Sequence, residues 1–247
     1  MSPTATTPRI HFSDLVSDFL HYILENNASR TTLIVCGTRD SFLEQLSASV
    51  HPRPSARNPS PAYEEQNQHD GNTDLLLGRV EHVEHISPLL TKTIGLLANS
   101  RKVRLEFCPT LEHLRAYLSV LRISRDKQNQ THHHGRPMLA ILDLVALHCT
   151  TSEFSAQGLS RTFAIAVEAA AREKMDLVLC ECKDAIDAQN GELGERLWYL
   201  HVPLLSGSIR TGEEGAWSGP SVPVKRIAQR WFHFDEKEDV MTDIIDV

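Results

Sequence analysis

The chain has 247 residues, of which 41% are hydrophobic and 23% are charged, and its formal net charge is −7. This composition is typical of a globular protein with a substantial core, and it argues against a disordered chain. Residues 235–246 alone carry six carboxylates and one lysine. The rest of the chain is therefore near neutral, which disfavours a general attraction to nucleic acid but permits a local basic patch.

The N-terminal residues and the cysteines indicate an intracellular protein. No stretch approaches the roughly 20 apolar residues of a membrane span. The first ten residues lack the charged and apolar regions of a signal peptide. The five cysteines are an odd number and lie mostly in apolar runs, which is typical of buried thiols in a reducing compartment. We therefore expect no membrane association.

The hydrophobic pattern along the chain predicts helices that alternate with strands. The first helix is predicted at 12–27, where large apolar residues recur at helical spacing. The predicted strands span 31–37, 102–108, 138–147, 176–182, 194–205 and 224–234. A helix is predicted directly after the first strand, and two more at 110–122 and 158–174. Strands that alternate with helices predict an α/β fold with a doubly wound, mostly parallel sheet and helices on both faces.

Two polar segments interrupt this pattern and are interpreted as flexible insertions. They lie at about 51–74 and 124–137, and neither carries enough apolar residues to bury a surface. The three consecutive histidines of the second insertion lack the spacing of a shaped metal site, so we expect no metal there. The predicted organisation is an N-terminal helix segment (1–29), a core (30–235) and an acidic tail (236–247).

The turn after the first predicted strand lies where a P-loop would be. From Gly37, the P-loop pattern requires Gly-Lys-Ser/Thr after four residues, but those places hold Phe42, Leu43 and Glu44. Phenylalanine fills the space where the backbone must approach phosphates, leucine brings no charge, and glutamate repels phosphate. We interpret the turn as a degenerate phosphate site. An unrelated strand–turn–helix remains the alternative.

The order of the predicted elements resembles the RecA-like recombinase superfamily over about residues 30–235. A strand and helix in the P-loop position come first, a buried strand then ends in Asp143, where a Walker B acid would be, and a Gly/Ser-rich loop at 206–222 precedes the last strand. The resemblance implies a RecA-like core. With the degenerate P-loop, it implies a pseudo-ATPase that has no catalytic residues and binds no cofactor or metal.

RecA-like proteins that have lost their ATP site are accessory subunits, and the chain is similar to the recombinase paralogues of the Shu complex type. That similarity implies a nuclear, non-catalytic subunit of a hetero-oligomer that assists homologous recombination and DNA repair, with DNA and other RecA-like subunits as partners. Two alternatives remain open. One is the RecA-like ring of the Elongator accessory subassembly, which binds tRNA and implies a cytoplasmic location. The other is a nucleotide-dependent enzyme with an atypical phosphate loop.

The resemblance also implies which residues contact nucleic acid, because the loop before the last strands faces DNA in this superfamily. The cations of this region would contact phosphates, and its exposed aromatic residue would stack on a base. The expected residues are Arg210, Trp217, Lys225, Arg226 and Arg230. Two glutamates in the same loop weaken this interpretation, so a protein interface at 205–230 is an equal alternative.

Two further groups of residues receive structural interpretations. Cys180 and Cys182 alternate on a predicted strand, and we expect them to face opposite sides as separate buried thiols. Glu181 and Asp184, at the end of the same strand, are interpreted as surface carboxylates.

Overall fold

The computed structural model describes residues 7–26, 28–50, 88–91, 93–123, 135–186, 193–204 and 220–235. Its main feature is a six-stranded sheet of order β3-β2-β4-β5-β1-β8, in which every paired strand is parallel to its neighbour. The strands are β1 (Arg9–Ile10), β2 (Thr31–Val35), β3 (Val103–Phe107), β4 (Met138–Leu142), β5 (Asp176–Cys180) and β8 (His233–Phe234). The predicted α/β fold with a mostly parallel sheet is confirmed.

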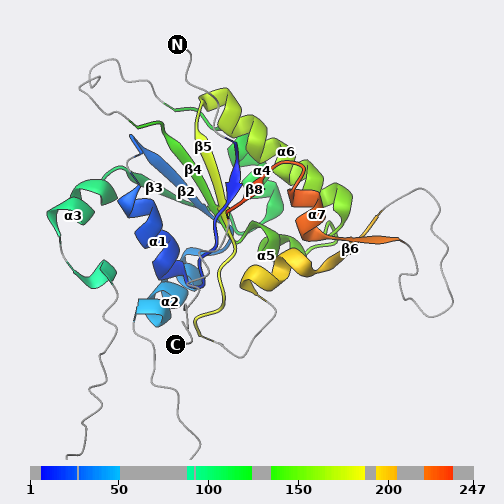
Figure 1. Cartoon of the computed structure of the whole chain (residues 1–247), viewed down its shortest axis with the longest axis horizontal. Coiled ribbons are helices and arrows are strands. Elements are labelled where there is room, and N and C mark those ends of the chain that lie inside the picture. The colour runs from blue at the N-terminus through cyan, green and yellow to red at the C-terminus, as the bar shows by residue number, and fades with distance from the viewer. Residues whose placement is uncertain are drawn as a thin grey trace, which may run out of the picture.

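Helices cover both faces of this sheet (Figure 1). One face packs against α1 (Val16–Glu25) and α2 (Arg39–Val50), and the other packs against α4 (Leu111–Val120) and α6 (Ala156–Glu173). The shorter helices are α3 (Ile94–Ser100), α5 (Leu144–Cys149), α7 (Val224–Ala228) and two 3₁₀ helices, η1 (Pro88–Leu90) and η2 (Gly194–Tyr199). This arrangement is that of a doubly wound sheet.

The alternation of side chains along the central strands divides the core into two hydrophobic clusters. In β2, Leu33 and Val35 belong to the cluster on the α1 face, and Ile34 belongs to the cluster on the α6 face. Because both faces are covered, all five residues of β2 and all five of β4 are buried. This double coverage explains why the two strands are nearly continuous apolar runs in the sequence.

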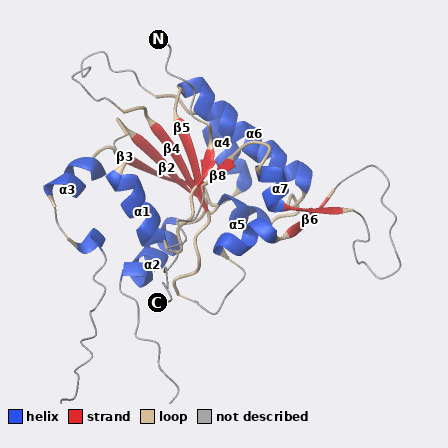
Figure 2. Cartoon of the chain, viewed as in Figure 1, coloured by secondary structure: helices blue, strands red, loops and turns tan. Residues whose placement is uncertain are grey.

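The structure corrects the prediction for the C-terminal third of the chain. Residues 194–199 form η2 instead of a strand, and the strand predicted at 224–234 is α7 followed by a turn and the short β8. Val224, Ile227 and Ala228 are buried together at helical spacing, which is why this segment is helical. Two short strands, β6 (His201–Pro203) and β7 (Ser221–Pro223), form a separate antiparallel pair beside α7 (Figure 2).

The N-terminal segment belongs to the same body as the core. β1 lies in the sheet between β5 and β8, and α1 buries Val16, Phe19 and Ile23 against the sheet. The predicted insertion at 51–74, most of the one at 124–137 and the acidic tail at 236–247 lie outside the described residues. In the part of the chain that the structure describes, no helix combines the length and hydropathy needed to cross a bilayer.

Candidate functional site

The carboxyl ends of β2 and β4 define the first candidate site. β2 has β3, the next strand along the chain, as one neighbour in the sheet. Its other neighbour is β4, and β5 follows β4 in the same direction. The strand order therefore reverses between β2 and β4. Doubly wound sheets hold their ligands at such a switch point. The turn at Gly37 and the carboxylate of Asp143 follow these two adjacent strands, and Cys36 N–H donates to the Leu142 carbonyl at 2.9 Å. The turn at Gly37 and Asp143, which the sequence assigns to a degenerate phosphate site, therefore lie at one edge of the sheet.

The turn after β2 is shorter than a phosphate-binding loop. α2 begins at Arg39, and the Thr38 hydroxyl accepts from Ser41 N–H at 3.2 Å at the start of this helix. Phe42 N–H already donates to the Thr38 carbonyl at 3.1 Å. A Cβ placed on Gly37 would meet no atom within 4 Å, so close packing does not require a glycine there.

The three residues in the Gly-Lys-Ser/Thr places lie inside α2. Phe42 is buried, and its ring packs edge-on against Phe107, with ring centroids 5.7 Å apart. Leu43 and Glu44 are exposed on the helix surface. Phe42 is therefore a core residue, and no lysine or hydroxyl takes the position that would hold phosphate and magnesium.

Asp143 and Glu181 connect the ends of β4 and β5 through reciprocal hydrogen bonds. Asp143 N–H donates to the Cys180 carbonyl at 2.9 Å, and one Asp143 carboxylate oxygen accepts from Cys182 N–H at 3.0 Å. The Glu181 carboxylate accepts from the N–H groups of Val145 at 2.7 Å and Ala146 at 3.1 Å, at the start of α5. Both carboxylates thus satisfy backbone donors at the switch point.

The prediction that Glu181 is a surface carboxylate is wrong, since only 3% of the residue is exposed. Burial, together with the charge of Asp143, raises the pKa of Glu181 well above its ordinary value. Burial also raises the pKa of Asp143 to about 7. Two neighbouring carboxyl groups with raised pKa values favour a state in which at least one of them is protonated. Asp184 instead accepts a hydrogen bond from the Gln45 side chain of α2 at 2.6 Å.

The expected separation of Cys180 and Cys182 is also wrong. Their sulfur atoms lie 3.8 Å apart, because residues two apart on a strand point to the same face. Both thiols are reduced and buried, as the apolar sequence predicts, and the hydrogen bond with the Cys180 sulfur, followed by burial, raises the pKa of Cys182. Over the described residues, no group of three or more His, Cys, Asp or Glu side chains could hold a metal ion.

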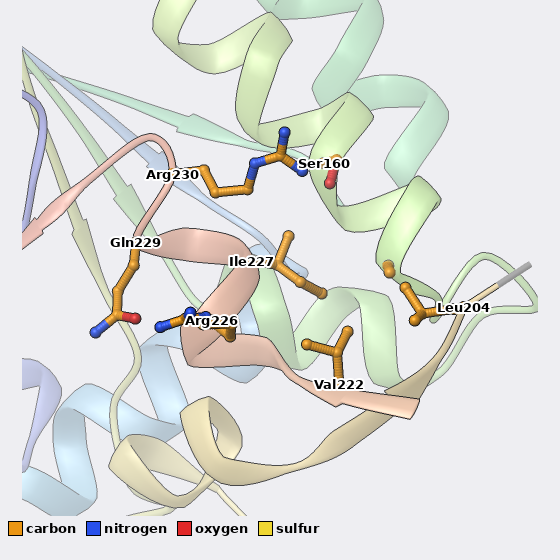
Figure 3. Close-up of a pocket in the computed structure, with 8 residues that line it drawn as sticks. Ser160, Leu204, Val222, Arg226, Ile227, Gln229 and Arg230 are labelled. Carbon is orange, nitrogen blue, oxygen red and sulfur yellow. The ribbon is translucent and has the colours of Figure 1, made fainter. Parts of the chain in front are cut away.

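A second candidate site lies on the α6 face of the fold, where α7 meets the start of α6 and the β6–β7 pair. A pocket of about 480 Å³ opens there. Its apolar wall comes from Leu204, Val222 and Ile227, and its polar groups come from Ser160, Arg226 and Arg230. Figure 3 shows Arg230 extending toward Ser160 across the pocket. Both arginines are exposed and line the pocket, and no side-chain hydrogen bond or ion pair joins either of them to another described residue.

The structure separates the five predicted nucleic-acid contacts into three groups. Arg226 and Arg230 are exposed and line the same pocket, as two residues four apart on a helical turn can. Lys225 instead contacts the protein: its ammonium lies 3.3 Å from the Tyr199 hydroxyl and 5.1 Å from the centre of that ring. Arg210 and Trp217 lie outside the described residues. The pocket itself was not predicted, because Ser160 and Arg226 are far apart in the sequence.

The fold and these two regions define a doubly wound α/β protein with two neighbouring carboxylates at the ends of β4 and β5, Glu181 buried and Asp143 partly buried, and a basic pocket beside α7. A family model described as SPAC22G7.03-like matches residues 62–189, and the chain belongs to this family. The matched residues include β3, β4 and β5 with Asp143 and Glu181, and they end before α7. No curated protein and no solved structure matches the chain.

Proposed function

We propose that the chain is a non-catalytic, RecA-like accessory subunit that binds DNA and partner subunits in a nuclear complex for homologous recombination and repair. The observation that carries the DNA-binding part is the pocket between α6 and α7. Its two arginines have no partner among the described residues. A guanidinium group is a strong hydrogen-bond donor to phosphate oxygens, so these two side chains suit contacts with a nucleic-acid backbone.

The chemistry of the pocket suits a nucleic-acid strand. The guanidinium groups of Arg226 and Arg230 would contact neighbouring phosphates, and the wall formed by Leu204, Val222 and Ile227 would contact the apolar face of a sugar or base. Since the net charge of the chain is −7, two cations give weak binding alone. A partner subunit that adds cations beside the pocket would increase the affinity.

The geometry after β2 supports the non-catalytic part of the proposal. The helix α2 begins two residues after Gly37, and its second turn carries a core phenylalanine where a nucleotide-binding enzyme needs glycine and lysine. Asp143, in the Walker B place, accepts a backbone hydrogen bond and links two strands. This arrangement supports a structural role for the side chain of Asp143, through its hydrogen bond with Cys182 N–H.

We expect Arg226→Ala/Arg230→Ala to lower the affinity for single-stranded DNA roughly tenfold and to reduce the slope of log affinity against log salt concentration by about 1.4. The loss should be the same for different base sequences, because phosphate contacts carry no base information. Fluorescence anisotropy with labelled oligonucleotides over a salt series measures both quantities.

The matched control for this experiment is Arg39→Ala/Arg101→Ala. It removes two exposed cations from the β2–β3 side of the sheet and changes the net charge equally. Equal weakening by both double variants would assign the effect to net charge and contradict a site at α7. Stronger binding of tRNA than of DNA by the wild type would favour the Elongator-type alternative.

We expect isothermal titration calorimetry with ATP and magnesium to show no binding. The chain lacks the lysine and the glycine-rich turn that hold phosphates, and Glu44 would repel them. Micromolar binding that disappears in Asp143→Ala would contradict the pseudo-ATPase interpretation and support the nucleotide-dependent enzyme.

A further inference from the structure

The strand β3 forms an edge of the sheet and exposes part of its surface. Its one partner in the described part of the chain is β2, and no hydrogen bond of that part reaches its outer side. Arg104 and Leu105 are exposed, and Arg104 forms an ion pair with Glu106 two residues along the same strand. An exposed edge of this kind is a template for pairing with another chain.

The direction of the backbone groups identifies which residues of β3 face outward. Lys102 C=O accepts from β2 at 3.0 Å, and Cys108 N–H donates to β2 at 2.9 Å, so the even-numbered residues bond inward. Backbone directions alternate along a strand. The N–H and C=O groups of Val103, Leu105 and Phe107 therefore point away from β2.

We propose that β3 pairs antiparallel with β3 of a second copy of the chain, with the two Leu105 residues opposite each other. In this register each Leu105 exchanges two hydrogen bonds with its counterpart, and Val103 does the same with Phe107 of the second copy. All of these bonds use outward-facing backbone groups. The pairing extends the sheet across a two-fold axis, as isologous dimers do.

The charges of β3 are complementary in this register. Because the strand reads Val-Arg-Leu-Glu-Phe, Arg104 lies opposite Glu106 of the second copy, and the reciprocal pair forms on the other side of the axis. A parallel, in-register pairing would place Arg104 opposite Arg104 and is disfavoured. The sequence of the edge thus selects a closed dimer over an open stack of strands.

The helix α3, which leads into β3, adds apolar surface to this edge. Ile94 is 87% exposed and Leu97 is 57% exposed, and no residue of α3 is buried. Figure 1 shows α3 at the β3 end of the molecule, far from α7. A two-fold axis normal to the sheet keeps both α3 helices on the same face of the extended sheet. Ile94 and Leu97 of each copy would then pack against the other copy. The additional contact is needed because a pair of five-residue strands is small for a stable interface.

Sedimentation velocity of the full chain over a concentration series tests the proposal. The wild type should dimerise reversibly, and Glu106→Arg should raise the dissociation constant roughly tenfold or more, because it places arginines opposite each other twice. The exchanged variant Arg104→Glu/Glu106→Arg should dimerise like the wild type, since it restores both opposite-charge pairs.

A second variant tests the backbone pairing. Leu105→Pro removes an N–H that points away from β2, so it should leave the fold intact, as proline on an edge strand does, and abolish dimerisation. Circular dichroism melts check that each variant is folded. A wild type that stays monomeric at every concentration would overturn the proposal. So would folded single variants that dimerise as strongly as the wild type, or an exchanged variant that stays monomeric.

Discussion

Gly158→Ala should lower the free energy of unfolding by about 3 kcal/mol, although alanine is normally the better residue in a helix. Gly158 is buried in the first turn of α6, where its N–H donates to the Ser155 hydroxyl at 3.1 Å. A Cβ at this position would overlap the backbone carbonyl oxygen of Glu153. Backbone cannot yield as a flexible side chain can, so either α6 or the preceding turn must shift.

The shift would also disturb a network of hydrogen bonds beside Gly158. Arg115 of α4 donates to both carboxylate oxygens of Glu153, at 3.0 and 2.6 Å, and to the Thr162 hydroxyl of α6 at 2.9 Å. This network links α4 and α6 on one face of the sheet. Moving Glu153 would weaken it, which adds to the steric cost.

Urea unfolding followed by circular dichroism measures this effect, and Gly37→Ala is the matched control. At Gly37 an added Cβ meets nothing within 4 Å, so the same substitution should leave stability unchanged or raise it by up to about 1 kcal/mol. A Gly158→Ala protein as stable as the wild type would show that the turn before α6 adapts without cost.

The central strands of the fold could be predicted from the sequence, but its short elements could not. Doubly covered strands such as β2 and β4 are continuous apolar runs, and that pattern is visible without a structure. β1 has only two residues in the sheet, too few to show a period. The segment with α7 alternates apolar and polar residues irregularly, and burial against its neighbours decides that it is helical.

The candidate sites, too, could be predicted from the sequence only in part. The sequence predicts Asp143 at the end of a buried strand, and the structure places it there. The prediction that Glu181 lies at the surface is wrong, although a single acid between two cysteines at the end of an apolar run is a signal for a buried carboxylate. The basic pocket depends on contacts between α6 and α7, more than 50 residues apart, and sequence spacing carries no information about such contacts.

We expect Asp143→Asn to raise the free energy of unfolding at pH 8 by about 2 kcal/mol. The pKa of Asp143 is raised from 3.8 to about 7, so at pH 8 the folded protein carries a charge that its surroundings disfavour. Partial contact with water keeps the gain below the full equivalent of this shift. Asparagine can still accept from Cys182 N–H, and it tolerates the left-handed backbone of this position, where φ is 60°.

The effect of Asp143→Asn on the free energy of unfolding should depend on pH, and this dependence tests the cause of the stabilisation. Between pH 3.8 and about 7 the folded wild type holds a proton on Asp143 that the unfolded chain has released, so its stability falls as the pH rises. Asp143→Asn should make this fall shallower, and it also removes the charge that adds to burial in raising the pKa of Glu181. Urea unfolding at pH 5 and pH 8 measures the difference, with Asp40→Asn on the exposed surface of α2 as the control for loss of one charge. An Asp143→Asn protein that is less stable than the wild type at pH 8 would mean that the ionised carboxylate, and not its protonated form, holds the ends of β4 and β5 together.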